Sequence, residues 1–279
     1  MRRPGPDYPG PVPNSEQNPG ATPAPGDDTV DPRHHRRPLS YVRRTARLTA
    51  GQQKAWDTRR QRYLVDVPHE HRELSVHPDW RFDAAAEFGR SAPLVLEIGT
   101  GQGECIVHAA ATHPERDHLA VEVYRPGVAQ TIVRAGHAGA EPSVAGGNPG
   151  HELDNLRIMQ VDAAELLGHG LPEASLDELW VFFPDPWPKT RHHKRRLVTP
   201  AFAELAARAI RPGGRWRLAT DWAEYGEVML AVADAAEGFR NAHGPGGRAP
   251  RFEGRVMTSF ERKGLDAGRS VTDLEYVRL

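Results

Sequence analysis

Between Leu94 and the C-terminus, short apolar runs alternate with stretches long enough to form a helix. The runs are LVLEIG, HLAVEV, LRIMQVDA, LDELWVFFPD and RWRLATDW, and ECIVHAAATH is typical of the stretches between them. Strands that alternate with helices build a mainly parallel sheet with helices on both faces. The pattern therefore predicts a Rossmann-like α/β fold. RFEGRVMTSFERKG and SVTDLEYVRL are expected to supply the last strands, one of them antiparallel and at the edge.

The N-terminal part of the chain has a different composition. Residues 1–38 are dense in proline and glycine and hold almost no aliphatic side chains. Such a segment buries too little apolar surface to offset the entropy lost on ordering, which predicts a disordered tail. Residues 39–279 form the predicted folded domain. Within it, GAEPSVAGGNPGHE (residues 139–152) is predicted to be a loop, to which we assign no function.

The domain opens with a basic arm at about residues 39–65. Its arginines are Arg43, Arg44, Arg47, Arg59, Arg60 and Arg62. They fit the solvated face of a charged helix, and they equally fit an arm that follows phosphate groups. The sequence leaves both interpretations open.

Composition excludes several classes of protein. No run approaches the roughly 18 apolar residues that a membrane span needs, and the N-terminus lacks the apolar stretch of a secretory signal. The single cysteine, Cys105, excludes an internal disulfide framework, so a reducing cytoplasm is the expected location. The formal net charge is −1, so any binding of nucleic acid must rest on local clusters of cations.

A glycine turn follows the first predicted strand. In LVLEIGTGQGE its glycines are Gly99, Gly101 and Gly103, at the edge where ligands bind a doubly wound sheet. Their spacing differs from the G-x-G-x-x-G that places a pyrophosphate on a helix. Glu97, just before the turn, would repel a pyrophosphate but suits the ammonium group of an amino acid. The turn therefore favours S-adenosylmethionine over NAD as the cofactor.

Two more acids end the next two predicted strands. Glu122 can accept hydrogen bonds from both hydroxyls of a ribose, a device that NAD enzymes share. Asp162 is placed to accept one from an adenine amino group. Each acid alone could equally cap a helix or lie in a solvated loop, but three on successive strand ends favour a nucleoside cofactor. Cys105 is expected to be a small core residue rather than a nucleophile, because no partner base lies nearby in sequence.

The fourth predicted strand ends in an acidic corner, residues 183–187. Pro184 and Pro186 fix the backbone around Asp185 and remove two donors, so the strand ladder cannot continue there. Asp185 is thereby held at the carboxyl edge of the sheet, beside the expected cofactor sulfonium. A simple strand-ending turn would also explain the prolines, but not the chemistry that follows.

A cationic run (residues 189–196) follows this corner directly. It consists of Lys189, Arg191, Lys194, Arg195 and Arg196, with His192 and His193 between them. Charge runs are usually solvated faces, but one beside the cofactor edge would pull an RNA backbone across the mouth of the site. The two histidines lack accompanying ligands at metal-binding spacing, so no metal is predicted.

These motifs resemble those of one known family. FFPDPWPKTRHHKRRLV, with EIGTGQGE, VEVYRPGV, ATDW and TSFERKG in this order, resembles the bacterial tRNA (guanine-N7-)-methyltransferases over about residues 40–279. The departures are Ser259, where many members carry lysine, Tyr124, where histidine is common, and a long loop at residues 139–152. The resemblance implies a class I methyltransferase fold: a mainly parallel seven-stranded sheet with an antiparallel edge strand and helices on both faces.

The resemblance also implies a reaction and the residues that serve it. A methyl group would pass from S-adenosylmethionine to N7 of a guanine in tRNA, at position 46 of the variable loop. Asp185 would be the catalytic position, and the cofactor site would comprise Glu97, Gly99, Gly101, Gly103, Glu122, Asp162 and Asp185. The substrate contacts would be Lys189, Asp221, Thr258, Ser259, Phe260 and Glu261. The RNA contacts would be Arg191, His192, His193, Lys194, Arg195 and Arg196.

The chemistry makes modest demands on these residues. Guanine N7 carries a lone pair at neutral pH, so transfer needs placement rather than a general base. Asp185 could stabilise the positive charge that develops on the purine or could hold the methionine ammonium, and the sequence does not separate the two. The carboxylate of Asp221 or Glu261 can accept from guanine N1 and N2. Alternatively, Asp221 caps a helix and Glu261 lies on the surface.

Two other functions are compatible with parts of the sequence. An amino-group nucleobase methyltransferase uses a similar acidic corner after its fourth strand. A non-catalytic RNA-binding module could keep the fold without turnover, but the intact acids at positions 97, 122, 162 and 185 argue against it. The sequence does not decide which tRNAs are used, or whether the protein is a monomer or a homodimer.

Overall fold

The computed structural model describes residues 47–138 and 152–279. The predicted tail at residues 1–38, the first part of the basic arm and the predicted loop up to residue 151 lie outside the described residues. The rest of the arm includes helix α1 (Ala50–Tyr63), which begins with a capping box between Thr49 and Gln52. Ala55 and Trp56 of α1 are buried, so this part of the arm belongs to the folded domain.

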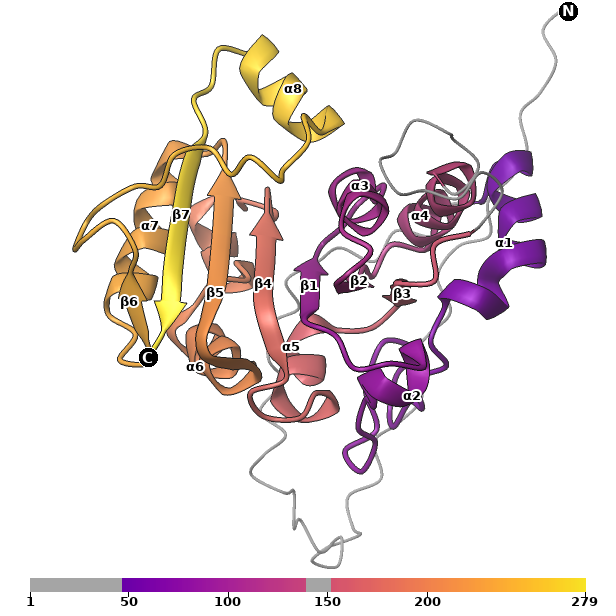
Figure 1. Cartoon of the computed structure of the whole chain (residues 1–279). Helices are drawn as coiled ribbons and strands as arrows, with labels where there is room; N and C mark the ends of the chain where they lie inside the picture. The colour runs from indigo at the N-terminus through magenta and orange to yellow at the C-terminus, as the bar shows by residue number, and fades with distance from the viewer. Residues whose placement is uncertain (1–46, 139–151) are drawn as a thin grey trace, which may run out of the picture. The chain divides into compact units, whose positions relative to one another are not determined.

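Seven strands form one sheet within the described residues, in the order β3-β2-β1-β4-β5-β7-β6 (Figure 1). They are β1 (Leu94–Ile98), β2 (Asp117–Val121), β3 (Leu156–Met159), β4 (Leu176–Phe182), β5 (Ile210–Thr220), β6 (Phe239–Asn241) and β7 (Thr272–Arg278). Strands β1 to β5 are parallel, and β7 pairs antiparallel with both β5 and β6. The predicted fold class is confirmed. The antiparallel strand, however, lies one place in from the edge strand β6.

Helices follow the strands as the alternation predicts. They are α2 (Ala84–Phe88), α3 (Glu104–Thr112), α4 (Arg125–Ala138), α5 (Ala163–Glu165), α6 (Pro200–Ala209), α7 (Ala223–Asp234) and α8 (Ser259–Asp266). A π-helical turn, η2 (Leu166–Gly170), and a 3-10 helix, η3 (Thr190–Arg195), complete the helical segments of the described residues. No helix among these combines the length and apolar character that crossing a membrane requires.

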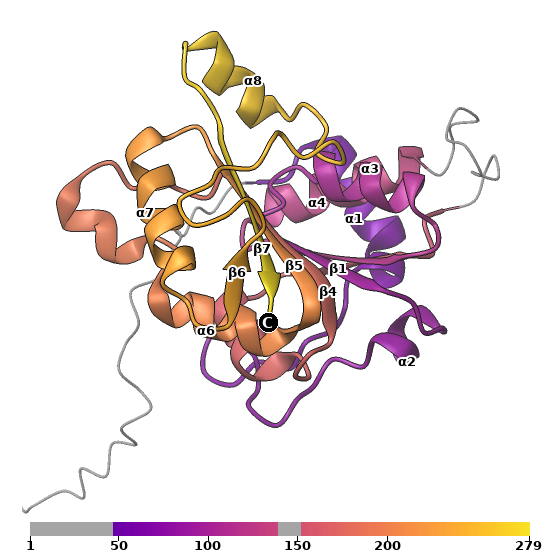
Figure 2. The ribbon, with the colours of Figure 1, turned by 60° about the vertical axis from the view of Figure 1, so that its left-hand side comes forward.

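Helices cover both faces of the sheet (Figure 2), and each face has its own hydrophobic core. Successive residues of a strand point to opposite faces. Leu96 of β1 and Leu179 of β4 therefore join the core beneath α6 and α7, whereas Val95 and Trp180 join the core beneath α1, α3 and α4. Because side chains fill both faces, the carboxyl ends of the strands are left for a ligand.

The prediction of a strand in RFEGRVMTSFERKG is wrong. Helix α8 (Ser259–Asp266) begins in this segment, and the Oγ1 of its cap Thr258 accepts a hydrogen bond from the backbone N–H of Glu261 at 3.1 Å. The sixth strand is instead the short β6. The sequence TSFE carries the spacing of a capping box, a threonine followed three residues later by glutamate. That local signal identifies the helix start better than the apolar content did.

Candidate active site

A cavity of about 350 Å³ lies at the carboxyl ends of β1, β2 and β4. Helix α8 lies at the arrowhead ends of β4 and β5, and its first turn completes the cavity wall (Figure 1). The predicted site residues that line this cavity are Glu97, Gly99, Gly101, Glu122, Asp185, Thr258 and Phe260. The structure thus brings together residues that are up to 163 positions apart in the sequence, between 97 and 260.

The glycine turn (residues 99–103) lines the cavity through its first four residues, 99 to 102. Its three glycines all have left-handed backbones, with φ of 74°, 57° and 73°. At Gly103, which caps α3, a Cβ atom would also lie 2.5 Å from Oγ1 of Thr131. The turn is therefore restricted to glycine by backbone conformation and, at its end, by space. Such a turn lets the backbone approach a ligand closely.

Glu97 points a buried carboxyl group at the cavity. The residue is 4% exposed, and its Oε2 has no hydrogen-bond partner within residues 47–138 and 152–279. Burial raises the pKa of Glu97 to about 8, although the backbone hydrogen bond from Ile106 opposes the rise. An unpaired buried carboxyl group is costly, so this oxygen is suited to a donor on a ligand. The ammonium group of S-adenosylmethionine fits that requirement.

Glu122 is held rigidly at the end of β2. Oε1 accepts hydrogen bonds from the backbone N–H groups of Val123 and Tyr124, both at 2.8 Å, and Oε2 accepts one from Gly101 at 2.8 Å. Burial raises the pKa of this carboxyl group, and the three backbone hydrogen bonds oppose that rise. A carboxylate with two oxygens has acceptor capacity beyond three bonds. Glu122 can therefore also accept from the hydroxyls of a ribose.

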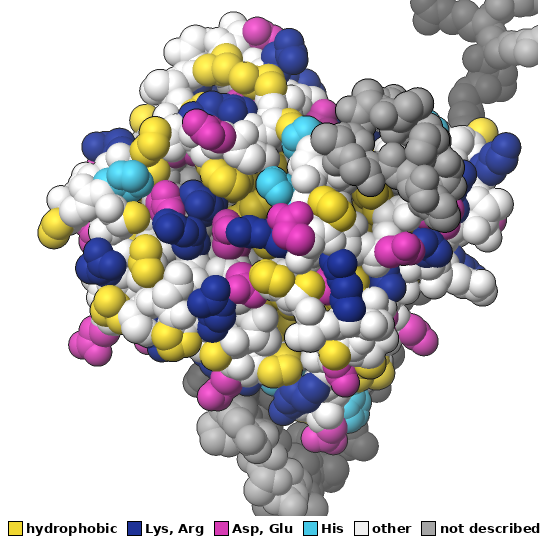
Figure 3. Space-filling model, viewed as in Figure 1, with side chains coloured by type: hydrophobic (Ala, Val, Ile, Leu, Met, Phe, Trp, Pro, Cys, Tyr) yellow, Lys and Arg dark blue, Asp and Glu magenta, His cyan; other side chains and the backbone are white. Residues whose placement is uncertain are grey.

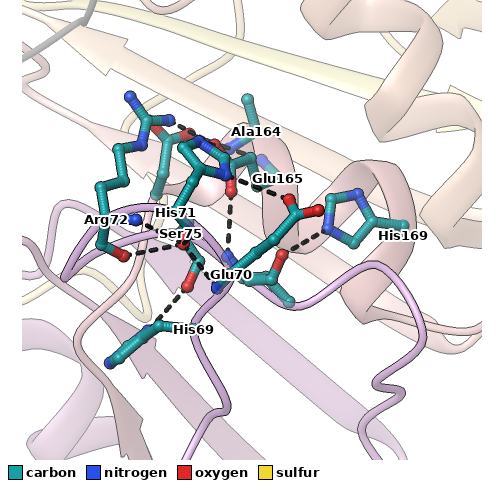
Figure 4. A network of polar contacts seen from close by, with 10 residues as sticks. His69, Glu70, His71, Arg72, Ser75, Ala164, Glu165 and His169 are labelled. Atoms are coloured by element: carbon teal, nitrogen blue, oxygen red, sulfur yellow. Dashed lines mark hydrogen bonds and ion pairs between the residues drawn. The ribbon is translucent and has the colours of Figure 1, made fainter. Parts of the chain in front are cut away.

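Asp162 takes part in a network of polar contacts at the start of α5. Figure 4 labels other members of this network, among them Arg72, Ser75 and Glu165. Its Oδ1 caps α5, and its Oδ2 lies 3.5 Å from Nη2 of Arg72. Arg72 also pairs with Glu165, and Oγ of Ser75 accepts from three successive backbone amides, at positions 70 to 72. The sequence left open that Asp162 caps a helix, and one oxygen of its carboxylate does so.

Asp162 borders the cavity without lining it. The residues on either side of it, Val161 and Ala163, do line the cavity. The side chain of Asp162 is 13% exposed, and Oδ2 has room for a further hydrogen bond beside its ion pair. A contact with an adenine amino group is therefore compatible with the capping role.

The acidic corner is strained at both ends. Phe183 and Trp187 have φ of 51° and 46°, a left-handed conformation that side chains other than glycine rarely adopt. Pro184 and Pro186 lie between them, and Asp185, at the centre, is exposed and lines the cavity. Strain of this kind costs of order 1–3 kcal/mol per residue and persists only where the surroundings enforce it. The corner is therefore a held structure rather than a relaxed turn.

The cationic run does not face solvent along its whole length. Lys189, Arg191 and Lys194 are exposed, and the guanidinium of Arg195 lies 4.4 Å from the centroid of the Trp187 ring. Arg196 is only 5% exposed, so its predicted contact with RNA stays a prediction for a side chain that the fold buries. The two histidines are half-buried, and no group of three potential metal ligands occurs among the described residues.

The two carboxylates expected to read guanine have different environments. Asp221 is 19% exposed and accepts from Nε of Arg269 at 2.8 Å, and the cap of α7 is Trp222, not Asp221. The side chain of Glu261 is 2% exposed and accepts hydrogen bonds from two arginines. The alternative that Glu261 lies on the surface is therefore wrong, and its contact with guanine stays a prediction.

A buried ion-pair cluster under α8 explains the position of Glu261. Arg251 donates to both of its oxygens at 2.9 Å, and Arg255 donates to Oε1 at 3.1 Å. Arg255 is fully buried, also pairs with Asp273 of β7, and lies 5.3 Å from the ring centroid of Phe183. The cluster thus joins α8, β7 and the acidic corner.

Glu104 is a further member of the site that the sequence analysis did not single out. It follows the glycine turn, lines the cavity, and accepts hydrogen bonds through Oε2 from both the backbone N–H and the hydroxyl of Ser259. These bonds attach the first turn of α8 to the start of α3. The motif EIGTGQGE contained this residue, but only the fold shows its partner. Cys105, beside it, is buried, as expected of a core residue.

The sequence of this chain is similar to those of known proteins. A family model described as "Putative methyltransferase" matches residues 91–274. A tRNA (guanine-N(7)-)-methyltransferase of Paenarthrobacter aurescens (strain TC1) is 42% identical, covering 86% of this chain and 91% of its own. The protein of that name from Cutibacterium acnes is 45% identical, and the match covers 86% of this chain and 83% of that protein. The one from Halorhodospira halophila is 47% identical, and the match covers 86% of this chain and 95% of that protein.

Proposed function

Since the chain belongs to the tRNA (guanine-N7-)-methyltransferase family, we propose that it methylates N7 of the guanine at position 46 of tRNA, in the variable loop. The observation that carries this proposal is the unpaired buried oxygen of Glu97, which shares one cavity with the acidic corner. S-adenosylmethionine supplies the methyl group, which it carries on a positively charged sulfonium.

The cofactor-binding half of the cavity is formed by the strand ends. Glu97 would accept from the ammonium group, Glu122 from the ribose hydroxyls and Asp162 from the adenine amino group. The glycine turn would let the backbone lie against the cofactor. Each of these carboxylates already has its orientation fixed by backbone hydrogen bonds or by burial, so little ordering is required when the cofactor binds.

The substrate half is formed by the acidic corner and α8. Phe260 is 54% exposed and lines the cavity, so its ring can stack on a base that has left the RNA stack. Asp221 would accept from guanine N1 and N2, and Glu261 would act indirectly by holding α8 in place. Asp185 would stabilise the positive charge that N7 acquires.

The exposed part of the cationic run would bind the phosphates. The face of the molecule seen in Figure 3 mixes Lys and Arg with Asp and Glu, in keeping with the net charge of −1. RNA binding must therefore depend on local groups, of which Lys189, Arg191 and Lys194 adjoin the acidic corner. Arg195, stacked on Trp187, would link this run to the corner.

Neutralising two cations of the run should weaken tRNA binding. For Arg191→Gln combined with Lys194→Gln, we expect a lower affinity and a plot of log affinity against log salt that is shallower by about 1.5, because two phosphate contacts are lost. Affinity for S-adenosylmethionine should be unchanged. The control pair is Arg81→Gln with Arg240→Gln, two exposed arginines outside the run. An unchanged salt slope in the first pair would show that the run is only a solvated surface.

Binding of S-adenosylmethionine should release a proton through Glu97. At pH 7 this carboxyl group is mainly protonated in the free protein, because its pKa is about 8. A bound ammonium group favours the carboxylate and lowers that pKa. Affinity should therefore rise by up to about tenfold per pH unit between pH 6 and 7, where the ligand amine stays charged. Glu97→Gln should remove the dependence.

Calorimetry in buffers of different ionisation enthalpy measures that proton directly. For the native protein at pH 7, close to one proton should be released per ligand, and for Glu97→Gln close to none. Equal proton release by the two proteins would show that Glu97 does not bind the ammonium group.

Label transfer tests the proposed function as a whole. Unmodified tRNA and methyl-labelled S-adenosylmethionine should give labelled 7-methylguanosine, and substitution of guanine 46 should abolish the label. Label in N6-methyladenosine or N2-methylguanosine would instead identify an amino-group methyltransferase. Cofactor binding without any transfer to RNA would support a non-catalytic module.

A further inference from the structure

Arg196 ends the cationic run, yet its guanidinium lies inside the protein. It is 5% exposed, and its Nε donates to the backbone carbonyl of Pro186 at 2.9 Å. Nη1 donates to Oε1 of Glu224 at 2.9 Å, and Nη2 pairs with Oε2. A planar guanidinium is the side chain best suited to hold a carboxylate and a carbonyl at once. Arg196 thus bridges the acidic corner and helix α7.

The carbonyl that Arg196 holds lies at the strained end of the corner. Pro186 precedes Trp187, whose φ is 46°, and the position of the Pro186 carbonyl fixes the peptide plane between the two residues. Neither proline of the corner has an N–H to anchor it. A hydrogen bond to this carbonyl therefore opposes relaxation of Trp187 towards an extended backbone, a change that would move Asp185.

Helix α7 supplies a firm support for the bridge. The guanidinium of Arg196 lies 4.7 Å from the ring centroid of Tyr225, which is fully buried, and the hydroxyl of Tyr225 accepts from the N–H of Val198 at 3.1 Å. The side-chain hydrogen bond from Arg196 lowers the pKa of Glu224, so this partner is ionised at neutral pH. The bridge is therefore fixed at the α7 end by charge and packing together.

We propose that Arg196 and Glu224 position Asp185 for methyl transfer rather than bind RNA, an inference that rests on the proposed function of the site. Arg196 touches neither reacting group. It holds the corner in the strained conformation that places Asp185 on the cavity wall. Glu224 holds the guanidinium, so the two residues act as one unit.

The test compares Arg196→Lys with a matched control. Lysine keeps the charge but cannot bridge Pro186 and Glu224 with a planar fork. We expect kcat at saturating tRNA and S-adenosylmethionine to fall at least about tenfold, with the dissociation constant for S-adenosylmethionine unchanged. The control is Arg208→Lys. Arg208 also donates to backbone carbonyls, those of Leu167 and Leu171. The kcat of this variant should match that of the native protein.

A second variant covers the case in which Arg196→Lys does not fold. Glu224→Gln alters a side chain that is 53% exposed and leaves the bond to Pro186 possible, so it should fold and lose about threefold in kcat. The double variant should be no slower than Arg196→Lys alone, because both changes act through one bridge. If Arg196→Lys folds and has the kcat of the native protein, the proposal is overturned. If Arg196→Lys does not fold, a native kcat in Glu224→Gln overturns it. A loss confined to the KM for tRNA, with a shallower salt dependence, would make Arg196 a phosphate ligand and overturn it as well.

Hydrogen exchange separates this inference from the proposed function. Amides of residues 183–189 should exchange faster in Arg196→Lys than in the native protein or in Arg208→Lys, whatever the substrate is. If the native protein methylates no tRNA but this difference is present, the proposed function fails and the positioning of the corner stands. Unchanged exchange would refute the positioning itself.

Discussion

Replacing Asp185 by alanine is expected to lower kcat by about 100- to 1000-fold, the range found when a preorganised electrostatic group is removed from an active site. The fold should survive, because Asp185 is exposed and the strain of the corner is held by its neighbours. Methyl transfer to unmodified tRNA at saturating cofactor measures the effect, and thermal unfolding checks the fold. Asp79→Ala, at another exposed aspartate, is the control and should leave both unchanged.

The same variant separates the two roles that the sequence left open for Asp185. If Asp185 holds the methionine ammonium, its removal should weaken binding of both S-adenosylmethionine and S-adenosylhomocysteine, since both carry that group. If it stabilises the charged guanine, both affinities should stay the same and only kcat should fall. The unpaired buried oxygen of Glu97 already offers a site for the ammonium, so we expect the second result. Near-native turnover would contradict both roles.

The main elements of the fold could be predicted because each has a local signal. An apolar run such as LVLEIG marks a strand buried on both faces, and the order of strands and helices implies a mainly parallel sheet. The position of the acids at strand ends then follows from the carboxyl edge of a parallel sheet. The short strand β6 has only three residues, too few for a clear alternating pattern. At α8 two local signals conflict, because the apolar residues favour a strand whereas the cap at Thr258 favours a helix.

The surroundings of the charged residues could not be predicted, because their partners are distant in sequence. Arg196 pairs with Glu224, 28 residues further on, and Arg255 pairs with Asp273, 18 residues further on. Neither partner is distinguished from other acids by its local pattern. A run of seven basic or histidine residues therefore looks uniform in sequence, whereas the fold buries its last member and exposes others.

The ion-pair cluster under α8 allows a clear test of how much charged partners that are distant in sequence contribute to stability. We expect Arg255→Met to lower the free energy of unfolding by about 3–5 kcal/mol, because it leaves buried Asp273 and Glu261 without a cation they share. The midpoint of thermal unfolding should fall by about 10 °C. Arg251→Met is the matched control: it removes a partner of the same Glu261, but Arg251 is 40% exposed, so the loss should stay below about 1 kcal/mol.

The pH dependence of the Arg255→Met deficit shows whether unpaired carboxylates cause it. Burial alone would raise the pKa of Glu261, but hydrogen bonds from Arg251 and Arg255 lower it below its usual 4.5. In the native protein this pairing stabilises the fold above pH 4.5, and the stabilisation is lost as the pH falls through the lowered value. In Arg255→Met the pKa of Glu261 should rise, so protonation of this carboxyl group removes its unpaired charge and stabilises the variant as the pH falls. The difference in unfolding free energy should therefore narrow from pH 7 towards pH 4. If the difference in unfolding free energy stays constant from pH 7 to pH 4, the loss of stability comes from lost packing against Phe182 and Phe183 and not from unpaired charge.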